Sequence, residues 1–352
     1  MNRCGNYLLN TEVYGSMIMN TWFDRPLSIA GSVMIQSEEG TVETEMVNFS
    51  QPVAVIPNLC IHHDRGANEG KHIDAQKELL PLVGLFESEW SLNTELAKEL
   101  EIDEEQIVTY DLYLYNSEDK ASFVGMNQNL ISAPRLDNGA SCCAALDALI
   151  ANTQRNRISP DPVYDELTMM KRLTSIKNTI NVLVMFDNEE VGSRTKQGAD
   201  SSLLSFCLEK IALGIGLNRQ QYLNMILSGQ MISADAAHAA HPNYPDRSDP
   251  TNQVQLNQGP ALKISASQSY ASDPEMIAAI EFLCREYNIL YSKYYNNSNI
   301  RGGSTIGPIS SSLVPMRTLD IGVPMLAMHS ACELIHSDSY LEFLKLLYVF
   351  YD

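Results

Sequence analysis

Two adjacent carboxylates, Glu189 and Glu190, stand shortly after an apolar, β-prone run at residues 182–186 and before Gly192. A buried strand that ends in paired acids needs something to neutralise them, because an unpaired buried charge is costly. A divalent metal ion with a bound water meets that need, since one acid can bind the metal while its neighbour takes a proton from the water. A solvated turn explains the same residues, so the choice depends on whether other strands end in ligand-type residues.

Three further apolar segments end in a residue that could bind a metal. Asp137 stands just before a helix-like segment at 139–151, Asp235 follows an apolar run, and His329 ends the short run at 323–328. Alone, such an aspartate is usually a helix N-cap, and such a histidine is usually structural. Four segment ends together place acids and an imidazole at one edge of an open α/β sheet, where such folds build their sites.

The elements that must position these residues change character along the chain. Up to Ser132, short strands alternate with turn formers, and we expect strands at 27–36, 41–47, 53–56 and 107–115 and a helix at 92–100. Beyond it, apolar runs alternate with helix-length segments, which is typical of parallel βα units. There we expect helices at 141–151, 201–213 and 274–287 and strands at 181–186, 224–232 and 289–294. The prediction is an α/β domain built from residues 1–27 and 133–352, interrupted by a β-rich domain at 28–132.

The composition narrows the class of protein. The chain has 352 residues and a net charge of −19, which argues against binding to nucleic acid or to anionic membranes, because both require basic patches. No apolar tract of about 18 residues that could span a bilayer occurs, and the N-terminus lacks the apolar core of a signal peptide. Seven scattered cysteines without a CxxC pair favour reduced thiols and a cytoplasmic location.

Several ordered motifs resemble the aspartyl aminopeptidase family of dinuclear zinc exopeptidases. They are spread over nearly the whole chain: TWFDRPLS at 21–28, IH at 61–62, APRLDN at 133–138, FDNEEVGS at 186–193, the stretch from SAD to Tyr244, GPALKISASQSYAS at 259–272, GGSTIGP at 302–308 and MHS at 328–330. The resemblance implies an α/β exopeptidase sheet with helices on both faces, interrupted by a smaller β-rich dimerisation domain. It also implies homodimers that assemble into large hollow oligomers.

Matched position by position, the resemblance assigns a role to each of the four acids named above and to the imidazole of His329. Asp137 resembles the carboxylate that bridges two Zn²⁺ ions, and Glu189 resembles the general base. Glu190 and His329 resemble further ligands of one metal, whereas Asp235 resembles a ligand of the other. Two metals that share a water would polarise the scissile carbonyl of a peptide.

Three more positions match residues near the substrate. Lys263 and His238 resemble residues of the substrate pocket, and His62 resembles a histidine that reaches a neighbouring subunit's site. An acidic substrate side chain needs local positive charge in so acidic a protein, which Lys263 would supply. The activity implied is release of acidic or neutral N-terminal residues from peptides.

The chain departs from the family pattern in one respect. The family has a His-Thr-Asp motif upstream of the TWFDR segment, and no such motif occurs in this sequence. One metal keeps Asp137, Glu190 and His329, which suffices for an open zinc site. The other keeps only Asp137 and Asp235, a poor zinc site at which an oxygen-preferring ion such as Mn²⁺ would remain; Co²⁺ is the other candidate metal. We therefore expect reduced activity unless a separate polypeptide restores the missing portion.

Three origins of this departure stay open: a start site assigned too late or a gene fragment, a shortened homologue with little catalysis, and a one-metal aminopeptidase. An alternative of another class is a weakly active or inactive scaffold that keeps the oligomer surfaces. Retention of Glu189 argues against the scaffold, which has no chemical need for a general base. A deacylase or carboxypeptidase with the same dinuclear chemistry fits the motif set less well.

Overall fold

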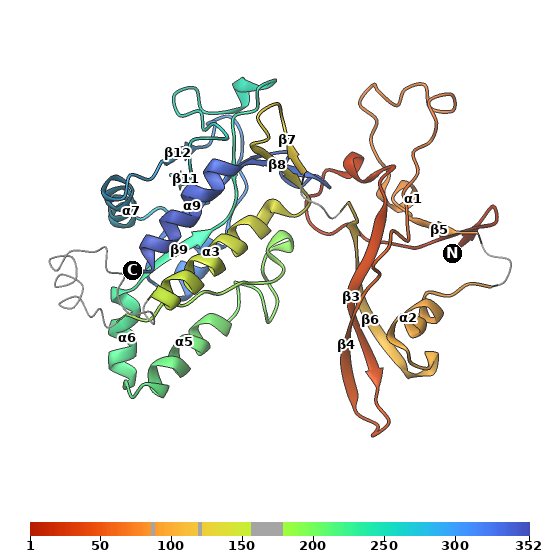
Figure 1. The fold of residues 1–352 in the computed structure, drawn as a ribbon, viewed down its shortest axis with the longest axis horizontal. Coiled ribbons are helices and arrows are strands. Elements are labelled where there is room, and N and C mark those ends of the chain that lie inside the picture. The colour runs from red at the N-terminus through yellow and green to blue at the C-terminus, as the bar shows by residue number, and fades with distance from the viewer. Residues whose placement is uncertain (86–88, 119–121, 156–178) are drawn as a thin grey trace. The chain divides into compact units, whose positions relative to one another are not determined.

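The computed structural model describes residues 1–85, 89–118, 122–155 and 179–352. By contacts, the chain forms two compact units (Figure 1). The first comprises Met1–Ser122 with His329–Cys332, and the second comprises Phe123–Met328 with Glu333–Asp352. This division by contacts differs from the predicted domains, 1–27 with 133–352 and 28–132, in placing residues 1–27 with the first unit. The predicted domains stay a prediction.

The first unit is rich in strands. Its elements are β1 (Asn2–Arg3), β2 (Asn6–Leu8), η1 (Met19–Trp22), β3 (Leu27–Gln36), β4 (Val42–Asn48), α1 (Ala75–Glu78), β5 (Leu82–Gly84), α2 (Leu92–Leu100), η2 (Glu104–Gln106) and β6 (Ile107–Asn116). The strands form two antiparallel sheets, ordered β1-β2-β5 and β4-β3-β6. Val33 of β3 and Leu96 of α2 are both fully buried and belong to one apolar cluster, so α2 covers one face of the larger sheet.

The second unit alternates strands and helices. Its elements are β7 (Ser122–Val124), β8 (Leu130–Ala133), α3 (Leu136–Arg155), η3 (Glu189–Val191), α5 (Leu203–Gly214), α6 (Arg219–Ser228), β9 (Gln230–Ala234), β10 (Ala237–His238), η4 (Pro245–Arg247), β11 (Ala261–Ile264), α7 (Pro274–Glu286), β12 (Ser292–Tyr295), α8 (Ile306–Leu313), β13 (Arg317–Gly322), β14 (Pro324–Leu326), β15 (Glu333–His336) and α9 (Ser337–Phe350). They build a four-stranded sheet, β12-β11-β13-β9, and a five-stranded sheet, β10-β14-β15-β8-β7.

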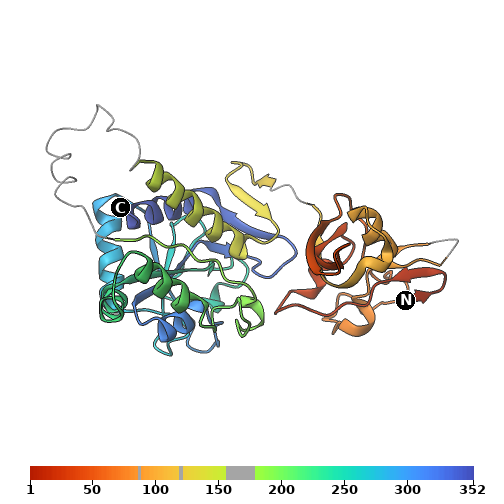
Figure 2. The same ribbon diagram turned by 90° about the horizontal axis from the view of Figure 1, so that it is seen from below.

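Helices cover both faces of the four-stranded sheet. Leu319 and Ile321 of β13 pack in one apolar cluster with buried residues of α3, α7 and α9, and α3 and α9 lie side by side in both views (Figures 1 and 2). Asp320 lies between Leu319 and Ile321 in β13. Its side chain contacts α8, because a Cβ atom placed on Gly307 of α8 would lie 2.2 Å from Oδ2 of Asp320. Successive strand residues alternate between faces, so α8 covers the second face. The predicted α/β class is confirmed.

Of the predicted strands of this unit, the one at 181–186 is wrong and the one at 224–232 is right only for its last residues. Residues 181–186 belong to no strand of the described structure; Leu183 instead packs on the cluster of α3 and α9, while Val184 and Phe186 pack on the cluster of α5 and α6. Residues 224–228 complete α6, which begins at a capping box between Asn218 and Gln221, and only 230–234 form β9.

Among the described helices, none is long and apolar enough to cross a bilayer.

Candidate metal centre

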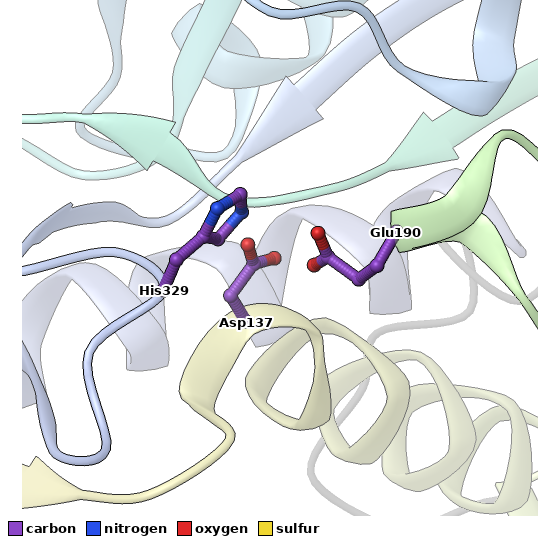
Figure 3. A group of neighbouring side chains, drawn as sticks. All are labelled: Asp137, Glu190 and His329. Atoms are coloured by element: carbon purple, nitrogen blue, oxygen red, sulfur yellow. The ribbon is translucent and has the colours of Figure 1, made fainter. Parts of the chain in front are cut away.

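Three residues predicted to bind one metal lie together. Asp137 comes from the start of α3, where its backbone is not helical, Glu190 from η3, and His329 from the loop that joins β14 to β15. Each offers one ligand atom, and these atoms all lie within 4.8 Å of one another (Figure 3). Two carboxylates and one imidazole are a ligand set that suits a catalytic zinc site with an open position. The residues present therefore fit the metal that the motifs imply.

The backbone beside each ligand adopts an unusual conformation. The φ angles of Arg135, Asn188 and His329 are 57°, 61° and 65°. They lie in the left-handed region, which residues other than glycine rarely adopt. Such conformations cost free energy and persist where the surrounding structure holds them, often at functional sites. One such residue lies at or within two residues of each ligand and sets the local direction of the backbone there.

Hydrogen bonds orient the His329 ring. Its Nδ1 lies 3.2 Å from the carbonyl oxygen of Ser16, and the His329 carbonyl accepts from the backbone N–H of Ile18 at 2.9 Å. A carbonyl oxygen only accepts, so Nδ1 is the donor in this contact, and in the neutral ring Nε2 is then the nitrogen that can bind a metal. This contact is typical of metal-binding histidines, whose second nitrogen is fixed by a carbonyl or carboxylate.

The start of α3 is tied to two strands. The backbone N–H of Asp137 donates to Oε2 of Glu333, the first residue of β15, at 2.8 Å. The Asn138 side-chain amide donates to the carbonyl oxygen of Ala234 at 2.6 Å, next to Asp235. Sequence reasoning missed Glu333, although a buried acid in the apolar segment after His329 was the available signal.

Glu189 lies among several acids. Its pKa is raised to about 7, first because it is partly buried and then because of the negative charges of Asp235, Glu190 and Asp137; Lys263 acts in the opposite direction. The structure thus brings the predicted base into the electrostatic field of all three predicted carboxylate ligands. The negative charges of these acids favour the binding of a cation among them.

Asp235 does not belong to the group of three. Its Oδ2 lies 3.1 Å from Nζ of Lys263, whose side chain is buried, and the Lys263 ammonium lies over the ring of Tyr270, 5.3 Å from its centre. Burial lowers the pKa of Lys263, but the charges of Asp235 and Asp320 outweigh burial and raise it. Lys263 is therefore a charged residue inside the protein.

Asp320 is the second acid whose charge acts on Lys263, and sequence reasoning missed it. Burial raises its pKa to about 6, while the charge of Lys263 and hydrogen bonds from its surroundings lower it. Its Oδ2 accepts the backbone N–H of Ala271 at 2.6 Å. An aspartate inside the apolar segment 318–322 was the available sequence signal.

The two remaining predicted residues are exposed. His238 ends β10, and its ring lies 6.1 Å from that of Tyr294 between centres. His62 lies in a turn of the first unit. Their roles toward substrate stay predictions.

Comparison with known proteins identifies a family of zinc enzymes. The family model of the aminopeptidase I zinc metalloproteases, M18, matches residues 3–351. A probable M18 family aminopeptidase 2 of Clostridium novyi is 42% identical over 349 residues, which cover 98% of this chain and 75% of that protein.

Solved structures are similar over the whole chain. A cryo-EM structure of the Ape4 and Nbr1 complex has a TM-score of 0.89 and 31% identity, covering 100% of this chain and 67% of that one. The S. cerevisiae mApe1 dodecamer has a TM-score of 0.77 and 22% identity, covering 100% and 74%, which supports the fold alone. The chain belongs to the M18 family of zinc aminopeptidases.

Proposed function

We propose that the chain releases N-terminal residues from peptides at a zinc site formed by Asp137, Glu190 and His329, with Glu189 as general base. The observation that supports this most directly is the convergence of three ligand atoms within 4.8 Å from three separate elements. These three residues would hold the zinc ion, which would supply Lewis-acid polarisation of the scissile carbonyl and activation of a water. Glu189 accepts a proton from the attacking water and later gives it to the leaving amine.

The proposed stoichiometry is one tightly bound zinc ion. A second metal would have Asp137 and Asp235 as its carboxylate ligands, and Asp235 already pairs with Lys263 at 3.1 Å. Two carboxylates without an imidazole make a weak zinc site, whereas an oxygen-preferring ion such as Mn²⁺ tolerates them better. We therefore expect a second metal to bind more weakly, and Mn²⁺ to replace zinc there.

The proposed substrates carry an acidic or neutral N-terminal residue. The support is Lys263, a buried cation beside Asp235, because an acidic substrate side chain needs a positive partner in a protein with a net charge of −19. His238 would contact the substrate from β10, and His62 would do so at a neighbouring subunit's site.

The proposed assembly is a homo-oligomer built from dimers. The mApe1 structure, which shares the fold, is a dodecamer and is the precedent for this proposal. The proposed location is the cytoplasm, on the basis of the scattered cysteines of the sequence.

The experiment is a pair of peptides that differ only at the amino terminus. An aminopeptidase should release the first residue of the free peptide and leave the N-acetylated peptide intact, as followed by mass spectrometry. Chelation should abolish the release and zinc should restore it. Cleavage of the acetylated peptide, or loss of the C-terminal residue instead, would point to a deacylase or carboxypeptidase.

A further inference from the structure

Glu333 is a buried acid next to the proposed metal ligands. It begins β15 and its exposed fraction is 2%. Because a buried carboxylate is costly unless its oxygens are hydrogen-bonded, its partners indicate what it does. One of those partners is the backbone of a metal ligand.

The contact is with Asp137. Oε2 of Glu333 accepts the Asp137 backbone N–H at 2.8 Å, across 196 positions of sequence. Asp137 and the residue after it have non-helical backbone angles, so this N–H precedes the regular turns of α3 and no carbonyl within those turns can accept it. Glu333 therefore supplies this non-helical N–H with an acceptor, and an ionised acceptor makes the stronger kind of hydrogen bond.

The second connection of Glu333 is to the loop that contains His329. That loop joins β14 to β15 and ends at Glu333, four residues after His329. β15 pairs with β14 through Leu334 opposite Leu326, and with β8 through Glu333 opposite Ala133. Glu333 thus lies where the strand that leads to Asp137 meets the hairpin that presents His329.

We propose that Glu333 is a positioning residue for the metal site: its carboxylate fixes the backbone of Asp137 relative to the strand that anchors the His329 loop. Glu333 is not in the group of three ligands found among the described residues, so it acts through a ligand. Partners of this kind typically change metal affinity by about 10- to 100-fold when they are removed. The inference rests on the zinc site proposed above.

The test compares two substitutions of similar length. Glu333→Met removes the acceptor and keeps an unbranched side chain in the buried position, whereas Glu333→Gln keeps an oxygen that can accept the same N–H. The matched control is Glu342→Met, because Glu342 on α9 also accepts a backbone N–H, that of Leu290 at 2.9 Å, but contacts none of the three ligands through it. Zinc affinity of the metal-free proteins is measured by competition with a chromophoric chelator, with circular dichroism to verify folding.

We expect Glu333→Met to bind zinc about 10- to 100-fold more weakly, and Glu333→Gln and Glu342→Met to stay within about threefold of the unmodified protein, by the same scale of effect. Unchanged affinity in Glu333→Met, or an equal loss in Glu333→Gln, overturns the positioning role. If the methionine variant does not fold, Glu333→Asp, whose acceptor is one methylene shorter, takes its place with the same expectation. If the unmodified protein binds no zinc, the proposed zinc site is wrong. If it binds zinc and the variants bind equally well, only the positioning role of Glu333 is wrong.

Discussion

Glu189 and Glu190 are adjacent in sequence, yet their surroundings differ. Glu190 is exposed and belongs to the group of three ligands, whereas Glu189 is partly buried and its pKa is raised by burial and by the charges of neighbouring acids. The difference suits two roles, a ligand and a proton acceptor. The consecutive carboxylates after an apolar run were therefore informative in the sequence, although the sequence alone left a solvated turn open.

Glu189→Gln tests the proposed base. The amide cannot accept a proton from water, so we expect kcat to fall by about 10²- to 10⁴-fold, while zinc binding changes little. Steady-state hydrolysis of an aminoacyl peptide measures the effect, and Glu286→Gln on the surface of α7 is the control. Turnover by Glu189→Gln within threefold of the unmodified chain would remove Glu189 from the mechanism.

Lys263→Met tests whether Lys263 gives the enzyme its preference for acidic N-terminal residues. A charge-assisted hydrogen bond contributes about 1.5–3 kcal/mol, so we expect a loss of about 10- to 100-fold in kcat/KM for substrates with N-terminal Asp or Glu and a much smaller loss for Ala. Removing one partner of a buried pair also destabilises a fold by about 3–5 kcal/mol, so assays must stay well below the melting temperature.

The control for this substitution is Lys293→Met, because Lys293 pairs with Glu281 but is 39% exposed. We expect this variant to keep its preference among substrates. Equal losses on acidic and neutral substrates in Lys263→Met would assign Lys263 a structural role in place of a role in recognition.

The helix α8 depends on close contact with β13. Gly307 lies in its first turn, where a Cβ atom would be 2.2 Å from Oδ2 of Asp320 and 2.7 Å from Cγ. Asp320 is buried and held by the Ala271 N–H, so it cannot move aside without losing that bond. Only glycine fits between this helix and this strand.

Gly307→Ala should therefore destabilise the protein by about 1–3 kcal/mol, as overpacking of a well-packed core does. Urea unfolding measures the difference in the free energy of unfolding. Gly303→Ala is the matched control, because nothing lies within 4 Å of its Cβ position. If both alanine variants unfold at the same urea concentration, α8 is not packed on Asp320 as described.

Local signals account for the elements that the sequence predicted well. The helix at 92–100 and the strand at 27–36 match α2 and β3, because Ser91 caps the helix and the strand lies between turn formers. The run at 181–186 has equally strong β-propensity, but a strand also needs a hydrogen-bonded neighbour, which no local pattern specifies. Asp320 and Glu333 were missed for a similar reason: their burial depends on segments remote in sequence.

The outer face of the sheet β4-β3-β6 carries apolar side chains. Val42 and Met46 of β4 and Tyr113 of β6 are 64%, 73% and 44% exposed, and the strand register places Met46 and Val42 on one face. Exposed apolar patches commonly mark interfaces. This surface fits the proposed β-rich dimerisation domain.

Met46→Arg tests that assignment. A charge on the face should weaken an interface that buries it, so we expect the main species to shift to a smaller assembly in size-exclusion chromatography with light scattering. Met126→Arg is the control, because Met126 is fully exposed outside this sheet. An unchanged mass for Met46→Arg would place the interface elsewhere.

Zinc titration of the metal-free protein tests the shared site of Asp137, Glu190 and His329 most directly. We expect one tightly bound equivalent for the unmodified chain and for His72→Ala, a control at an exposed histidine. His329→Ala should bind zinc more than about 100-fold more weakly, because loss of a ligand exceeds the effect of losing a residue that supports one. Equal zinc affinity in His329→Ala and the unmodified chain would contradict the proposed site.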